Sequence, residues 1–331
     1  MPAVLLYPIT PWSKSDLYVD LVLTIAADFA ARELRFPNAK APVFPTGKRS
    51  IDDHGIRLTG VPMKASGTYT VGRQVVEFPI GLIPSVQSMS WLLAGLCQNK
   101  AYATTKYTIV TPTNKQAKWF SALISGTLEA STEKSVWKAL GCVPKSVKIG
   151  IPASGPDGGE VSLSADIIGS LFSQIDAIAG TAGTLDAGVP ILSSDCTFTM
   201  DAAATKVCAA NISFENGIGP DPNINTVAAG PDAMILGEYR INGDLTLIVE
   251  PDTTSKYYAI VNGLAAMTAH PLIINVGASI IITLNVIFEY PGAPTEQNGV
   301  YIQTFPWKAL YGSATDPKVE ITIADVLATW S

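Results

Sequence analysis

Histidine, the side chain best suited to acid–base and metal chemistry near neutral pH, occurs only twice in the 331 residues, at His54 and His270. His54 follows two aspartates in the run 51–55, and a carboxylate can orient an imidazole for catalysis. Adjacent side chains rarely face each other, however, and no activated serine or cysteine motif accompanies the run. His270 precedes Pro271, a setting typical of a turn or a strand edge. We therefore predict a polar loop at His54 and no catalytic residue.

Phosphate and metal motifs are incomplete in this sequence. The segment 46–50 has part of a phosphate-binding loop pattern, but Pro42 replaces the first glycine and Arg49 stands where serine or threonine is needed. There is no nucleophile elbow, zinc-protease helix or EF-hand loop, and the run 221–223 lacks the downstream glycine and glutamate of a calcium loop. We predict that the protein uses neither a cofactor nor a metal.

The sequence contains four cysteines, Cys97, Cys142, Cys196 and Cys208. They form no C-x-x-C pair, so neither a zinc site nor a disulfide scaffold is indicated, and buried, reduced thiols are the default. If residues 201–203 form a hairpin loop, Met200 faces Ala204 and the same register sets Cys196 opposite Cys208. That proximity would permit a disulfide without requiring one.

The composition indicates association with other copies. Charged residues make up 15% of the chain, apolar residues 47%, and the mean hydropathy is +0.28, whereas ordinary soluble domains carry about 25% charged residues. This leaves too little charge to cover the surface of a monomer, and large exposed apolar patches promote association. We therefore predict an obligate oligomer.

The charge balance argues against a nucleic-acid clamp. Twenty-eight acidic residues outweigh 22 basic ones, which gives a formal charge of −6, so counterion-release binding to phosphates is not favoured. The longest basic cluster is Lys48-Arg49, and no lysine or arginine stripe with interleaved aromatics provides a stacking platform for single strands. An acidic surface can still face DNA by repelling it.

One segment, 271–290, has about the length of a membrane span. From Ile280 onward it is dominated by β-branched residues, which prefer pleated surfaces, so we predict a buried strand and no membrane contact. Residues 1–7 hold no basic run before a short apolar stretch, and Pro8 soon follows, so a secretory signal is not supported. We expect synthesis to end in the cytoplasm.

Most of the regular pattern is that of strands, with one clear helix. Apolar residues recur at helical spacing from Ser85 to Gln98, and Ser85 is placed to cap the first turn, so we predict a helix that covers a sheet. Strand alternation in 145–151 and 161–167 flanks a Gly-Pro-Asp-Gly-Gly turn, which predicts a hairpin. Further alternating runs cover 197–200, 206–214, 238–250, 280–290 and 300–305. Such spacing indicates a sandwich or barrel.

The first 60 residues differ from the rest because they contain six prolines and little persistent pattern. Residues 17–25 alternate as in a strand, 26–34 are rich in helix formers, and 37–60 look like a long loop. Loops of this length are usually functional or disordered. We therefore predict an arm and loop over 1–60 for contacts between subunits, a β domain over 61–311 and a C-terminal tail over 312–331.

The order of several motifs resembles the tail tube family of long-tailed bacteriophages. A strand carrying Gly141-Cys142 leads into the alternating residues up to Ile151, and the hairpin return 160–169 follows. The runs 211–217, with Asn216-Gly217, and 238–247, with Gly243, come next. The helix around Trp91 precedes them. The resemblance covers roughly residues 60–310, by pattern more than by identity.

This resemblance implies a mainly β fold, a sandwich or barrel of the tail tube type with one flanking helix. It also implies hexameric rings with an inner β-barrel, stacked into a tube that conducts DNA during infection from a virion tail assembled in the host cytoplasm. The implied partners are other copies, the terminator, baseplate and tape measure proteins, and genomic DNA that passes without specific binding. As lumen candidates we select acidic residues on polar strand faces, namely Glu160, Asp166, Asp244 and Glu250.

Two other classes of function remain open on the sequence alone. One is another virion β protein, such as a tail terminator, a baseplate subunit or a capsid decoration protein. The other is an enzyme or a carbohydrate-binding β-sandwich, because such folds host many functions. Six tryptophans are available to stack on sugars, but they are scattered and most lie in patterns typical of core residues.

Overall fold

Strands dominate the structure, which confirms the mainly β class. The computed structural model describes residues 16–22, 34–37, 46–53, 69–97, 100–103, 106–109, 119–125, 136–153, 159–175, 184–185, 189–220, 234–235, 237–250, 252–310 and 320–324. Within these segments the helices are α1 (Val86–Cys97), α2 (Lys256–Gly263) and a 3₁₀ turn (Ser193–Asp195). The first of them is the predicted flanking helix.

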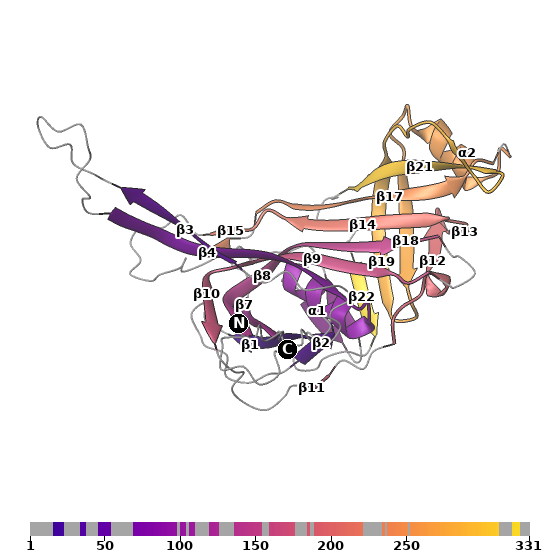
Figure 1. Cartoon of the computed structure of the whole chain (residues 1–331). Helices are drawn as coiled ribbons and strands as arrows, with labels where there is room; N and C mark the ends of the chain where they lie inside the picture. The colour runs from indigo at the N-terminus through magenta and orange to yellow at the C-terminus, as the bar shows by residue number, and fades with distance from the viewer. Residues whose placement is uncertain are drawn as a thin grey trace, which may run out of the picture.

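The main sheet is antiparallel throughout and runs across the width of the molecule (Figure 1). Its strands, from one edge to the other, are β3 (Thr46–Asp53), β4 (Tyr69–Leu82), β9 (Ser162–Gly169), β8 (Val136–Ile151), β14 (Ala209–Asn216), β17 (Tyr239–Ile248), β21 (Val300–Ala309), β19 (Ile280–Phe288), β18 (Ala269–Val276), β12 (Thr197–Met200) and β13 (Ala203–Thr205). β20 (Thr295–Gln297) pairs with β21, while β22 (Glu320–Ala324) joins β19 to β6 (Lys106–Ile109) and β5 (Lys100–Ala103).

Strand β8 is shared between this sheet and a second one. Its first half pairs with β10 (Leu171–Ile175) and β7 (Trp119–Ser125), which continues through β1 (Asp16–Val22) and β2 (Leu34–Pro37) to the parallel β11 (Thr184–Leu185). Gly141 has a φ of +61° and the register shifts between Pro144 and Ser146. Such irregularities bend a strand, so one chain segment serves both sheets. A separate pair links β15 (Gly219–Pro220) and β16 (Met234–Ile235).

The core lies between the crossing strands. Figure 1 shows β18 and β19 running across the direction of β9, β14 and β17, as the layers of an orthogonal sandwich do. Ile149 and Ile212 from one layer and Ile274 from the other belong to a single buried cluster. The period of two in both layers aims these side chains at the same interior. The predicted sandwich with a flanking helix is therefore confirmed.

Helix α1 closes the core against β8 and β14. The Ser85 hydroxyl accepts a hydrogen bond from the Ser88 amide at 3.0 Å, and the Ser88 hydroxyl accepts one from the Ser85 amide at 2.9 Å. This reciprocal cap starts the helix where the sequence predicted. Gly95 allows close approach, because a Cβ there would lie 3.1 Å from Pro144 Cγ in β8.

The predicted hairpin between 145–151 and 161–167 is confirmed by the pairing of β8 with β9, which sets Val147 opposite Ala165. The segment predicted as a buried strand, 271–290, consists of most of β18 and all of β19, joined through Gly277 at a φ of +66°. Among the described residues no helix is long and apolar enough to span a membrane.

The prediction of a long loop over 37–60 is wrong for residues 46–53, which form β3. Strand β3 pairs with β4 along one edge, and the two form a hairpin that projects from the body, outside the core (Figure 1). A strand in this position does not need the apolar alternation by which strands are predicted. The partial phosphate-loop pattern lies in this extended strand. Residues 17–22 of the strand-like run 17–25 lie in β1. Residues 23–33, which include most of the run rich in helix formers, lie outside the described residues, and Leu34 begins β2.

Candidate functional surface

The outward face of the main sheet is polar and extends across β4, β9, β8, β14 and β17. Its register places side chains in rows, and the first of these consists of Asp166, Ser146, Glu215 and Arg240. The next two rows are Ser164, Lys148, Ser213 and Asn242, then Ser162, Gly150, Asn211 and Asp244. The alternate residues of the same strands are apolar and buried. One side of the sheet is therefore core and the other a polar surface, which we call the polar face.

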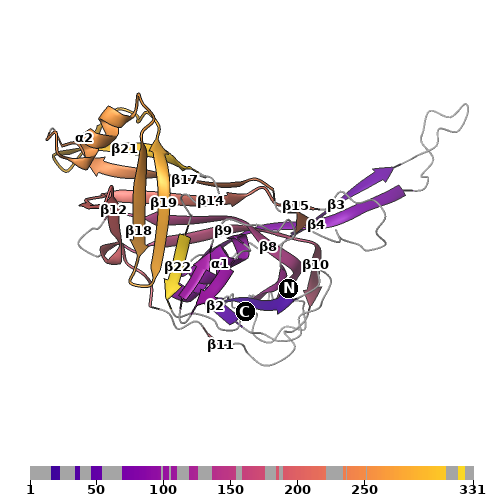
Figure 2. The same ribbon diagram turned by 180° about the vertical axis from the view of Figure 1, so that it is seen from behind.

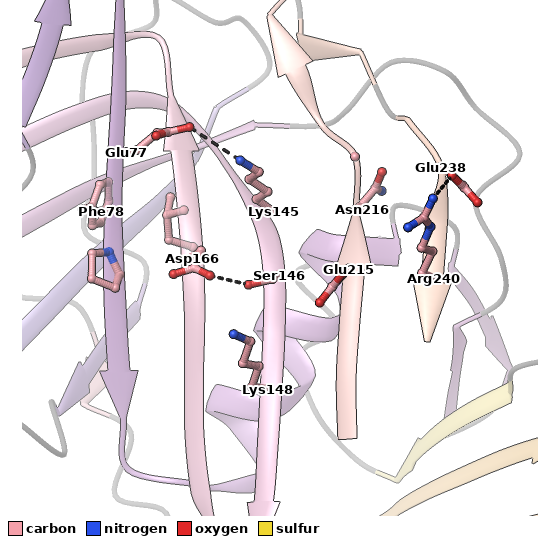
Figure 3. Close-up of a pocket in the computed structure, with 13 residues that line it drawn as sticks. Glu77, Phe78, Lys145, Ser146, Lys148, Asp166, Glu215, Asn216, Glu238 and Arg240 are labelled. Carbon is pink, nitrogen blue, oxygen red and sulfur yellow. Dashed lines mark hydrogen bonds and ion pairs between the residues drawn. The ribbon is translucent and has the colours of Figure 1, made fainter. Parts of the chain in front are cut away.

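Two ion pairs join charged groups at the end of the polar face, as the close-up in Figure 3 shows. Lys145 lies 3.7 Å from Glu77, and Arg240 donates to Glu238 at 2.5 Å. That hydrogen bond lowers the pKa of Glu238, which keeps the carboxylate ionised. The groups border a hollow of about 490 Å³. The surface therefore presents balanced charge and no basic cluster.

A second hollow of about 460 Å³ continues along β14 and β17. The Asn211 amide donates to Asp244 at 2.9 Å, and Lys308 pairs with Glu289 at 2.5 Å. Hydroxyl and amide side chains fill the rows between these pairs. The chemistry is that of a hydrated, weakly binding surface, since Asp244, Glu289 and Lys308 each have a local partner.

The four acidic lumen candidates separate into two groups. Asp166 and Asp244 lie on the polar face, and Asp166 accepts a hydrogen bond from Ser146 at 2.7 Å. Glu160 is exposed just before β9, an even number of residues from Asp166 along the strand, and so belongs to the same side. Glu250 borders a different hollow, between β13, β17 and the start of α2. Lys145, Lys148 and Arg240 share the polar face but were missed, because only acidic residues were selected from the alternating pattern.

The family-like positions prove to be packing positions. Gly141 adopts the positive φ that bends β8, and Cys142 is fully buried beside it. Gly169 of β9 packs against β8 at this bend because it has no side chain. A Cβ at this position would lie 3.0 Å from the Cys142 sulfur and 3.2 Å from the Leu140 carbonyl oxygen. These residues therefore hold β8 and β9 together at the bend.

The later motif positions fasten neighbouring elements in the same way. The buried Asn216 amide donates to the Leu96 carbonyl of α1 at 3.3 Å, and the Gly217 amide donates to the Glu238 carbonyl at 2.9 Å. A Cβ on Gly243 would lie 2.1 Å from the Asn211 carbonyl oxygen and 2.5 Å from Trp307 Cζ2. Only glycine fits there.

The reactive-looking residues do not gather into a site. His54 lies outside the described residues. His270 lies near the start of β18, is 6% exposed, and its Nδ1 is 3.0 Å from Asp201, which also lies 3.6 Å from the Lys256 ammonium. This contact ties the β12–β13 turn to β18 and α2. In the segments that the structure describes, no group of three His, Cys, Asp or Glu residues is placed to hold a metal.

The predicted register at the β12–β13 hairpin is wrong by one residue. Met200 pairs with Ala203, not Ala204, because Asp201 and Ala202 form a two-residue turn with φ of 49° and 60°. A slip of one residue sends side chains to opposite faces, so Cys196 and Cys208 are not opposite each other. Both are free thiols.

Comparison with known proteins agrees with the motif order. No curated protein sequence matches the chain. A family model described as phage tail tube protein matches residues 49–309 of the 331. The match spans β4 to β21, α1 and the whole polar face. This chain therefore belongs to the phage tail tube protein family and is a structural component of a phage tail.

Proposed function

We propose that copies of this chain close into hexameric rings, that the rings stack into the tail tube, and that the polar face lines the channel through which DNA is ejected. One observation carries the channel assignment: a continuous sheet with buried apolar residues on one side and short polar or paired charged residues on the other. Joining such sheets edge to edge around an axis produces a barrel with a polar interior.

Exposed strand edges support ring formation. Strand β3 pairs only with β4, and β13 only with β12, among the residues described. Unpaired edges promote uncontrolled association unless they are covered, and ring closure covers them with other copies. Because β3 lies within the first 60 residues, this agrees with the role proposed for that region as an arm between subunits.

Paired charges on the polar face suit the passage of DNA. Binding to phosphates gains free energy when lysine and arginine release counterions. Here Lys145, Arg240 and Lys308 already have carboxylate partners, and Lys148 alone among the described basic residues of the face has none, so that gain is small. Asp166 and Asp244, with Glu160 just before the start of β9, add repulsion. Glu250 lines a separate hollow, so the channel proposal rests on the other three.

Assembly is proposed to take place in the host cytoplasm, with the terminator, baseplate and tape measure proteins as further partners and no membrane involved. The carbohydrate-binding alternative gains nothing from the two tryptophans whose exposure the structure describes, because Trp91 and Trp307 are each only 1% exposed. Neither indole face is available to stack on a sugar.

Negative-stain microscopy of the purified protein tests the proposal. We expect hollow tubes built from stacked rings, with the ring number visible in end-on views. A terminator would stop at one ring, and a decoration protein would remain small. A single-copy species at high concentration under all solvent conditions, measured by light scattering, would contradict the proposed function.

A further inference from the structure

Lys148 is a cation of the polar face without an anionic partner among the described residues. It is exposed on β8 and takes part in none of the ion pairs that join them. It borders both hollows of the face. Figure 3 shows its ammonium group below Ser146, with no dashed line to a carboxylate. An ammonium group carries three N–H donors, so Lys148 offers both its charge and its donors to a ligand.

The neighbours of Lys148 across the sheet also have open donors. The register sets Lys148 opposite Ser164 of β9 and Ser213 of β14, and it sets Ser213 opposite Asn242 of β17. We call these four residues the lysine row. The Ser213 hydroxyl donates to Glu215 at 3.3 Å. The Ser164 hydroxyl and the Asn242 amide make no hydrogen bond to any other described residue. Three of the four side chains are therefore open to a ligand.

The rows on either side of the lysine row are bonded internally. In one of them the Ser146 hydroxyl donates to Asp166 at 2.7 Å, and in the other the Asn211 amide donates to Asp244 at 2.9 Å. Each of these rows contains a carboxylate, whereas the lysine row contains none. Of the three rows, the lysine row is therefore the one that attracts an anion.

The side chains of the lysine row match the chemistry of a phosphodiester. Proteins bind the phosphates of DNA mainly with lysine and arginine, and serine and asparagine side chains supply further donors. Neighbouring strands are about 4.8 Å apart, so the three spacings from Ser164 to Asn242 cover about 14 Å, with Lys148 between them. A row of this width is broad enough for the backbone of one DNA strand to lie against it.

We propose that the lysine row is a phosphate contact site for duplex DNA inside the channel, one in each subunit, which holds the DNA weakly between two rows that repel it. This assignment rests on the proposed function, because ring closure repeats the site around the channel and stacking repeats it along the DNA. Strands β9, β8, β14 and β17 run side by side across the body in both views (Figures 1 and 2). The contact is to the backbone alone and is therefore independent of base sequence. Weak sites that act together hold a ligand more firmly than any one of them.

Sedimentation of purified tubes with a short labelled duplex at low salt measures this contact. Lys148→Gln should raise the dissociation constant by about tenfold and make its dependence on salt shallower, because phosphate contacts are lost. Lys148→Arg should keep the binding, since arginine keeps the charge.

Lys308→Gln is the matched control. Lys308 lies opposite Asn242 on the next strand of the same face, but it is already paired with Glu289 at 2.5 Å. The control removes the same charge as Lys148→Gln and should change the dissociation constant by less than about twofold.

The outcomes separate the phosphate site from the function on which it rests. Equal loss of binding in Lys148→Gln and Lys308→Gln would overturn the site, because net charge would then govern binding. Unchanged binding in Lys148→Gln, or no binding to unsubstituted tubes, would overturn it too, and all these results leave the tube in place. Failure of the unsubstituted protein to form tubes, or bound duplex that stays open to nuclease on the tube exterior, would overturn the proposed channel together with the site.

Discussion

Gly243 is a residue at which a single methyl group decides whether three strands can pack. The Asn211 carbonyl and the Trp307 ring occupy the space that a Cβ would need. We predict that Gly243→Ala lowers the free energy of unfolding by about 1–3 kcal/mol, because the backbone of β14 must move. Chemical denaturation of the dispersed subunit measures this change.

Gly292→Ala provides the comparison, since nothing lies within 4 Å of the Cβ it would add. That substitution should leave the unfolding free energy within about 0.5 kcal/mol of the original. Equal stability of the two variants would show that the contact at Gly243 relaxes without cost.

The thiols of Cys196 and Cys208 should react slowly. Burial raises the pKa of each above its usual value, and Asp195 adds to the effect at Cys196. A raised pKa favours the neutral thiol in the folded protein. Each thiol therefore stabilises the fold fully below the thiol pKa of the unfolded chain, and this stabilisation is lost as the pH rises through the thiol pKa of the folded protein. We expect a thiol reagent at pH 8 to label both residues more slowly than in denaturant. Rapid labelling, or a disulfide found by mass spectrometry, would contradict this.

Among the elements, α1 depends on its reciprocal serine cap. Ser85 and Ser88 are both buried, and each accepts a hydrogen bond from the amide of the other. We predict that Ser85→Ala costs about 1 kcal/mol of stability. Because the two hydroxyls also contact each other at 3.1 Å, the loss in Ser85→Ala with Ser88→Ala should be smaller than the sum of the single losses. Additive losses in thermal unfolding would show that the two bonds act independently.

For the whole molecule, the charge of the polar face should govern the passage of DNA. We predict that Asp166→Lys with Asp244→Lys slows DNA ejection by about tenfold at low salt, because new cations attract phosphates. Tubes should remain intact, since both side chains lie on the outward face of the sheet. Ejection kinetics from particles carrying the substitutions measure the effect.

Asp166→Asn with Asp244→Asn is the control, because it removes charge without adding attraction. Its ejection should be nearer to that of the original particles and should depend less on salt. Unchanged ejection in the lysine variants would refute the assignment of the polar face to the channel.

Local patterns in the sequence predicted elements whose pairing partners are close along the chain. Helix α1 follows from apolar spacing and a capping serine, and the β8–β9 hairpin follows from two alternating runs around a glycine-rich turn. The order of such elements was enough to indicate the family. These features depend on the spacing of apolar residues along one helix or strand and on the residue types of one turn. Both are present within a short segment of sequence.

Tertiary structure alone decided the rest. Strand β3 has no apolar alternation and forms because β4 pairs with it. The two-residue turn at Asp201 and Ala202 shifts the register of β12 and β13 by one residue from the predicted one, so Cys196 is not opposite Cys208. The polar face likewise brings Glu215 of β14 beside Ser146 of β8, two strands far apart in the chain. Sequence spacing carries no information on which distant residues become neighbours, because long-range pairing is set by the packing of the whole core.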